Sequence, residues 1–150
     1  MLPRAIAFGF LLGAGALAAA DLPLPPRPAD AVRGAAFAAR IASLDPAARE
    51  NAVLAEVRRG NVPDFWRHFV DVKLDGGAVL AVAPDYLAIG SDDDCLFTPL
   101  SPATAQTIAD ELDCVLPTRK MVDAIFRAAP LKLVPAPIPP NESIDRKSVV

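Results

Sequence analysis

The chain has 150 residues, a formal net charge of −3 at pH 7 and a hydrophobic fraction of 53%. This length supports one domain with a modest core. A mildly acidic chain without a basic block lacks the charge pattern of nucleic-acid or anionic-membrane binding, so we expect no nucleic-acid partner. No phosphate-binding, dinucleotide or zinc motif is present, and we expect no cofactor, no metal and no catalytic residue in this chain.

Residues 1–20 have the pattern of a bacterial secretory signal peptide. Arg4 supplies a positive charge, residues 5–17 are apolar, and an A-x-A cleavage pattern ends at Ala20. We expect cleavage before Asp21 and a secreted or periplasmic location. The alternative is a retained membrane anchor, but an apolar run of about 13 residues is shorter than the roughly 20 that span a bilayer. We therefore expect no stable membrane span after cleavage.

Prolines dominate residues 21–29, which predict an extended spacer ahead of the folded domain. Two helices are expected next. Asp30 is placed to cap the first, over about 31–43, and Asp45 to cap the second, which begins at Pro46 and ends before Gly60. These two helices are expected to pack as an antiparallel pair.

Four short strands are predicted over residues 70–74, 79–83, 86–90 and 95–98. The first strand alternates apolar and charged residues, and an Asp-Gly-Gly turn separates it from the second. This pattern is typical of a β-hairpin. Because the four strands follow one another closely, we expect them to form a single antiparallel meander.

Two further helices complete the predicted domain. Ser101 caps a third helix that ends near Leu112, and Thr118 caps a fourth over residues 119–129. The expected buried face of the fourth helix is Met121, Val122, Ile125 and Phe126. A short strand is expected over 131–134. The predicted fold is α+β, a four-stranded antiparallel meander flanked by two helix pairs, over residues 30–134.

The C-terminal end of the chain differs in character. Residues 135–144 are a proline-rich linker, and residues 145–150 read D-R-K-S-V-V, which matches one translation frame of a common sequencing adapter. We expect this tail to be non-native and the chain to be the N-terminal part of a longer protein. The alternative is an ordinary C-terminal tail.

The two cysteines, Cys95 and Cys114, form the main candidate site. An oxidising compartment favours a disulfide between them, with a stabilisation of roughly 3 kcal/mol from the closed loop. The alternatives are two buried thiols or, less favoured, a cysteine nucleophile paired with His68, the single histidine.

Other polar residues have a functional and a simpler interpretation. The run Asp92–Asp94 could supply calcium ligands but lacks the alternation of a calcium loop, so a solvated hairpin turn is favoured. His68 alone cannot build a zinc site. The same simpler interpretation, surface solvation, is favoured for a further group that could line a cleft or hold an anion: Asp85, Tyr86, Ser91, Arg119 and Lys120.

Four segments carry a resemblance to known sequences: N-V-P-D-F-W-R (61–67), A-P-D-Y-L-A-I-G-S-D-D-D (83–94), A-T-A-Q-T-I-A-D (103–110) and L-P-T-R-K-M-V-D-A-I-F (116–126). Over about 30–143, the chain resembles the N-terminal half of a family of uncharacterised secreted bacterial proteins. The resemblance implies a longer protein with a histidine-containing second half. It implies no activity, and it places a bulky apolar residue where this chain has Cys95.

These observations predict the N-terminal portion of a secreted or periplasmic envelope protein of unknown activity that binds or processes cell-wall material. Its expected partner is cell-wall material or another envelope protein. The alternative is a complete, small, non-catalytic secreted binding domain with a Cys95–Cys114 disulfide.

Overall fold

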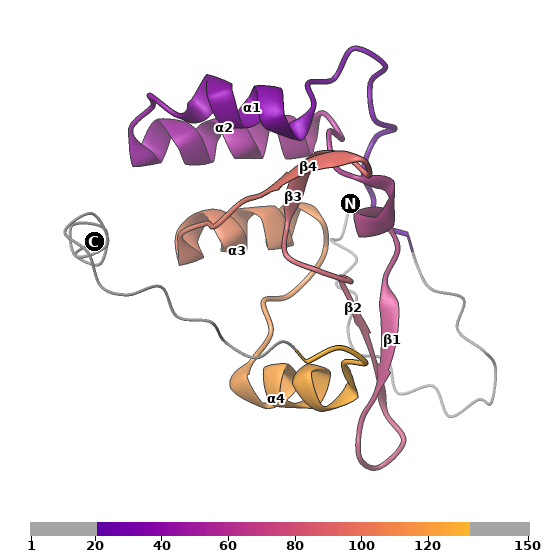
Figure 1. Ribbon diagram of the computed structural model, residues 1–150. Helices are drawn as coiled ribbons and strands as arrows, with labels where there is room; N and C mark the ends of the chain where they lie inside the picture. Colours follow the sequence, from indigo (N-terminus) through magenta and orange to yellow (C-terminus); the bar gives the residue numbers. More distant parts are fainter. Residues whose placement is uncertain (1–20, 133–150) are drawn as a thin grey trace, which may run out of the picture.

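A computed structural model describes residues 21–132 (Figure 1). The elements in chain order are α1 (Gly34–Ile41), α2 (Pro46–Arg58), the 3-10 helix η1 (Asp64–Arg67), β1 (Val70–Lys73), β2 (Val79–Val82), β3 (Ala88–Ser91), β4 (Asp94–Phe97), α3 (Pro102–Glu111) and α4 (Arg119–Ala128). This composition confirms the α+β class. The predicted signal peptide, the end of the strand expected over 131–134, the linker 135–144 and the tail 145–150 lie outside the described residues.

Three of the four α-helices begin where their capping residues predict. The side chain of Asp45 accepts a hydrogen bond from Ala48 N, and Ser101 and Thr118 make the equivalent contact at the starts of α3 and α4. The first helix differs, because Arg33 occupies its N-cap without a side-chain hydrogen bond and Asp30 does not cap it.

The predicted four-stranded meander is wrong in its pairing. β1 pairs only with β2 and β3 only with β4, so the strands form two separate antiparallel hairpins. Part of the reason is that Gly90 N, in β3, donates to Asn61 O at 3.2 Å. The segment after α2 therefore occupies a position beside β3 that a meander would give to β2.

α1 packs across the β3–β4 hairpin at a glycine-to-glycine contact. A Cβ on Gly34 would lie 2.5 Å from the backbone of Cys95, and one on Gly90 would lie 2.3 Å from Asp94 O. Gly90 also has a φ of 128°, which disfavours any side chain. This close approach brings the acidic β3–β4 turn to the start of α1.

The main core lies between the helices and the β3–β4 hairpin. Its residues come from the N-terminal segment, α1, α2, η1, β3, α3 and the turns that follow α2 and α3, and none of them belongs to β1 or β2: Leu22, Phe37, Val53, Val57, Val62, Trp66, Ile89, Ile108 and Leu112. Leu22 belongs to the predicted proline-rich spacer, so part of this segment packs into the domain. Figure 1 shows α1 and α2 side by side, with α3 beside α2.

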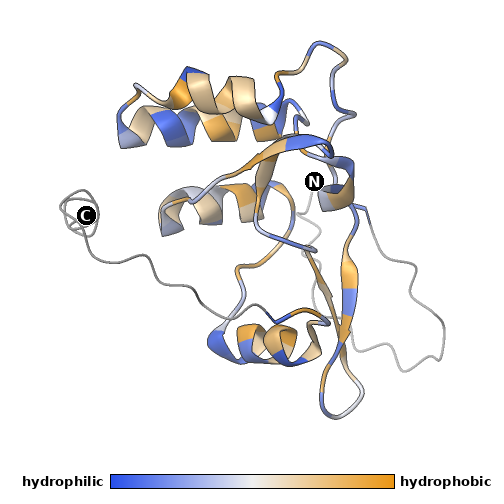
Figure 2. Cartoon of the chain, viewed as in Figure 1, coloured by the Kyte–Doolittle hydropathy of each residue, from blue (hydrophilic) through white to orange (hydrophobic). Residues whose placement is uncertain are grey.

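α4 lies at the opposite end of the molecule, against β1 rather than in a pair with α3 (Figure 1). Apolar and polar residues alternate along it (Figure 2). Ala124 is buried, but Val122 is 47% and Phe126 60% exposed. The predicted buried face of this helix is therefore wrong for these two residues, because the β1–β2 hairpin covers only part of the apolar side.

Candidate functional site

The acidic turn between β3 and β4 caps two helices that are remote in sequence. Asp94 Oδ1 accepts from Ala35 N at 2.9 Å, in the first turn of α1, and Asp94 Oδ2 lies 3.3 Å from Arg33 Nε. Asp92 Oδ1 accepts from Asp64 N at 2.6 Å, at the start of η1. A carboxylate is favourable at a helix N-terminus because unpaired N–H groups and the helix dipole both attract it.

This arrangement gives two of the three aspartates a structural role. Asp92 and Asp94 point to different helix starts, and Asp93 is exposed at the tip of the turn. Among residues 21–132, no group of three or more His, Cys, Asp or Glu side chains is arranged to hold a metal ion.

A buried polar network joins the N-terminal segment to α2. Asn61 is fully buried, and its Nδ2 donates to Glu56 Oε2 at 2.9 Å and to Val32 O at 3.0 Å. Arg27 Nε donates to Asn61 Oδ1 at 2.9 Å. Glu56 is 1% exposed, and its Oε1 lies 3.4 Å from Arg40 Nη1 and 3.7 Å from Arg59 Nη1. Every buried side-chain N or O in the described residues has a partner, so this network is saturated from within.

Glu50, on α2, holds the start of α3. Its carboxylate accepts from Ser101 N and Ser101 Oγ, each at 2.7 Å, and from Thr104 Oγ1. These hydrogen bonds, the one from Thr104 being the strongest influence, hold the pKa of the Glu50 carboxyl below its usual value.

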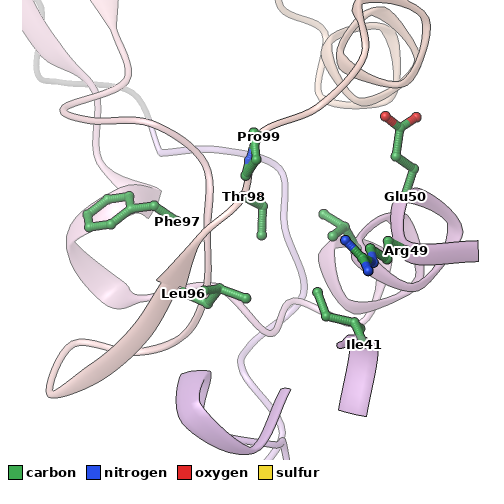
Figure 3. A pocket seen from close by; sticks show the side chains of 8 residues that line it. Ile41, Arg49, Glu50, Leu96, Phe97, Thr98 and Pro99 are labelled. Carbon is green, nitrogen blue, oxygen red and sulfur yellow. The ribbon is translucent and has the colours of Figure 1, made fainter. Parts of the chain in front are cut away.

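Glu50 also borders a small pocket between α1, α2 and β4 (Figure 3). Its volume is about 180 Å³, whereas sites for organic ligands are typically roughly 300–1,000 Å³. The lining residues are Ile41, Arg49, Glu50, Val53, Leu96, Phe97, Thr98 and Pro99. The Arg49 guanidinium donates to two backbone oxygens near the end of α1, and the Glu50 carboxylate accepts from Ser101 N at the start of α3. Both charged groups of the pocket wall are therefore already hydrogen-bonded within the domain.

His68 lies on the surface between two carboxylates. Its Nδ1 is 2.7 Å from Asp21 Oδ1 and its Nε2 is 3.8 Å from Asp64 Oδ2. The hydrogen bond with Asp21 is the main reason that the pKa of His68 lies above its usual value. Both ring nitrogens therefore lie near carboxylates. Within residues 21–132, neither Cys95 nor Cys114 forms a hydrogen bond with the His68 ring.

Both cysteines are free thiols in the structure. Burial raises the pKa of Cys114, whose Sγ donates to Leu112 O at 3.3 Å, and the aspartate beside it adds to this effect. Burial and three nearby aspartates raise the pKa of Cys95 as well. A raised pKa lowers the fraction of reactive thiolate at neutral pH, which opposes nucleophilic use of either residue. The disulfide stays a prediction.

The remaining candidates from the sequence do not converge. Asp85 accepts from Tyr86 N, and Asp85 O accepts from Trp66 Nε1 at 3.2 Å. Ser91 Oγ contacts Asp94 O within the same turn. Tyr86 is 82% exposed.

Sequence reasoning missed an apolar surface on α4. Val122 and Phe126 are one helical turn apart, so they lie on one side of the helix; we call this pair the α4 ridge. Other apolar side chains close to α4 in the sequence are also exposed: Val115, Leu116 and Leu131. The sequence does show that the apolar side of this helix is broad, because it includes Met121, Val122, Ile125 and Phe126. One neighbouring element, β1, covers only part of a side of that width.

No family model, curated protein or solved structure matches this chain. Between residues 21 and 132, no helix is both long and apolar enough to cross a bilayer. The resemblance to secreted bacterial proteins stays a prediction.

Proposed function

We propose that this chain is the N-terminal, non-catalytic docking part of a secreted or periplasmic bacterial envelope protein, and that it binds an envelope component through the α4 ridge. Cell-wall material and other envelope constituents are the partners that follow from this location. This contact would then hold the whole protein at the envelope, where it binds or processes its target.

The exposure of the α4 ridge is the observation that supports the proposal. Phe126 is 60% exposed and Val122 47%, although each has an apolar side chain on a helix that the rest of the domain only partly covers. Clustered exposed apolar residues are typical of interaction sites, whereas single ones are ordinary.

The polar clusters of the domain support the proposal indirectly, because they already have structural roles. The aspartates of the β3–β4 turn, the Asn61 network and Glu50 each make helix caps or hydrogen bonds that stabilise the domain. These groups are already engaged, which leaves exposed apolar side chains as the candidates for a contact. Of those in residues 21–132, Val122 and Phe126 lie one helical turn apart on the same helix.

The test is an export and binding experiment. The full chain is expressed with its own leader in a bacterium, and the N-terminus of the exported form is sequenced, with Asp21 expected first. The exported protein is then mixed with washed envelopes, where Phe126→Ser should lower the bound fraction several-fold. Phe97→Ser is the matched control, because Phe97 is 47% exposed on β4, away from α4.

Two results would contradict the proposal. One is retention of the chain in the cytoplasm with residues 1–20 intact. The other is binding to envelopes that Phe126→Ser and Phe97→Ser reduce equally, since this would remove the α4 ridge as the contact.

A further inference from the structure

We infer that the α4 ridge docks on an anionic phospholipid surface, lying at the interface without spanning the membrane. This inference rests on the proposed function and names the partner of the same site. It follows from three features of the helix: its one-sided exposed apolar residues, the local excess of basic residues, and the position of those basic residues at both ends of the ridge.

The geometry of α4 gives the ridge a fixed outward direction. Ala124 is buried and Met121 and Ile125 are half-buried, and the helix packs against β1. Val122 and Phe126 follow these residues around the helix and remain exposed. The hairpin therefore holds α4 in place, and the ridge needs no rearrangement to meet a flat surface.

The expectation against anionic-membrane binding rests on the charge of the whole chain, but the charge around the ridge has the opposite sign. Residues 115–132 contain four basic side chains and one acidic one, although the full chain has a net charge of −3. The four are exposed: Arg119, Lys120, Arg127 and Lys132. Within residues 21–132 none of them forms an ion pair with a carboxylate, and Lys132 Nζ donates to the backbone oxygen of Arg127 at 3.4 Å.

The basic groups bracket the apolar pair. Arg119 is three residues before Val122 and shares its side of the helix. Asp123, four residues after Arg119 and three before Phe126, is exposed on that side too, so the basic excess comes from Arg119 together with the flanking groups. Lys132 Nζ lies 5.6 Å from the centre of the Phe126 ring. Long basic side chains keep their stems on apolar surface while their charged ends reach outward. With the ridge in the outer acyl region, these ends would meet lipid phosphates.

This combination favours lipid over a second copy of the chain. A helix with a strongly charged face, a distinct apolar face and low overall hydrophobicity is the pattern of an interfacial helix. A symmetric dimer through the ridge would instead bring the basic groups of one copy against those of the other, and like charges repel. Anionic headgroups complement the local excess of four basic side chains over one acidic one.

The test uses the chain that begins at Asp21, with vesicles of phosphatidylcholine alone or mixed with phosphatidylglycerol. In flotation assays we expect binding only to the mixed vesicles, falling as salt is added because salt screens the contact. Phe126→Ser, Val122→Ser and Arg119→Gln should each lower the bound fraction several-fold. Phe97→Ser and Lys73→Gln, exposed on β4 and β1, should leave it unchanged, with circular dichroism checking that every variant is folded.

The outcomes separate the two proposals. Equal binding by Phe126→Ser and Phe97→Ser, absence of binding to phosphatidylglycerol vesicles, or a concentration-dependent dimer lost in Phe126→Ser would each overturn the lipid assignment. Binding to delipidated cell-wall sacculi that depends on Phe126, without binding to vesicles, would overturn it while leaving the docking function intact. Absence of binding of the native chain to both the vesicles and the sacculi would overturn both proposals.

Discussion

Arg27 Nε donates a hydrogen bond to Asn61 Oδ1 at 2.9 Å, across 34 residues of chain. The same guanidinium donates to Gly90 O, so it joins the N-terminal segment to β3 as well. Asn61 in turn donates to the buried carboxylate of Glu56. The Asn61 side chain thus connects segment 21–30 to α2, and Arg27 extends this connection to the β3–β4 hairpin.

Replacing Asn61 by Ala should therefore lower the free energy of unfolding by about 2–4 kcal/mol. The change removes three hydrogen bonds at a fully buried position and leaves Glu56 with one partner fewer. Urea unfolding followed by circular dichroism measures the loss. Asn51→Ala is the control, because Asn51 is exposed on α2 and should change stability by less than about 0.5 kcal/mol. Similar losses in the two variants would contradict the role of the network.

The three aspartates of the β3–β4 turn should differ in their effect on stability. Asp92→Ala and Asp94→Ala should each cost about 1 kcal/mol, the usual cost of losing an N-cap. Asp93→Ala should cost less than about 0.5 kcal/mol, since Asp93 is exposed at the tip of the turn. Thermal unfolding should also be unchanged by calcium or by a chelator. A rise of Tm with calcium, or a loss in Asp93→Ala equal to the others, would favour a metal-binding turn.

The parts of the fold that the sequence predicts are those fixed by neighbours in the chain. The caps at Asp45, Ser101 and Thr118 each bond to a backbone N–H three residues ahead, so a short window contains both partners. The β1–β2 hairpin likewise follows from alternation and an Asp-Gly-Gly turn.

The parts that the sequence does not predict depend on partners far along the chain. Asp94 bonds to Ala35 across 59 residues, and no local pattern marks that pairing. The break between the two hairpins depends in part on the hydrogen bond from Gly90 N to Asn61 O, which are 29 residues apart. For α4, periodicity predicts the helix and its apolar side, but the width of the cover that β1 and β2 provide is a tertiary property. The α4 ridge was missed for this reason.

Glu50 should make stability depend on acid pH. Its folded pKa lies below its usual value of 4.5, so its contribution is present above that value and is lost as the pH falls through the folded pKa. Glu50→Gln should therefore unfold at lower urea than the native chain at neutral pH, with a gap that narrows on acidification below about 4.5. Asp71→Asn, an exposed carboxylate on β1, is the control and should show little gap at neutral pH. A constant gap across the acid range would contradict the assignment.

The two thiols should react slowly with iodoacetamide at neutral pH, because burial raises the pKa of both Cys95 and Cys114. Labelling of the native and the urea-unfolded chain, read by mass spectrometry, gives the comparison. The native chain should react more slowly at both sites. Fast native labelling would contradict the burial argument. A mass lower by two hydrogens, restored by reductant, would instead establish the predicted Cys95–Cys114 disulfide in the exported protein.

His68 should titrate above its usual pKa of 6.5, and Asp21 should be the main cause. As the single histidine of the chain, it gives one imidazole signal to follow by proton NMR. Asp21→Asn should lower the pKa of His68 clearly, and Asp64→Asn should lower it less, because the contact to Asp64 is 3.8 Å and that to Asp21 is 2.7 Å.

The sign of the stability effect follows from the same shift. A pKa raised by folding means that the ion pair stabilises the fold fully below about 6.5 and that this contribution is lost as the pH rises through the folded pKa. Segment 21–28 should then become easier to cleave by protease above this range, and His68→Gln should remove the pH dependence. The matched comparison is His68→Gln with Asp64→Asn, since the latter keeps the Asp21 contact. Equal NMR shifts from Asp21→Asn and Asp64→Asn would contradict Asp21 as the dominant partner. A native titration at or below 6.5 would contradict the pair altogether.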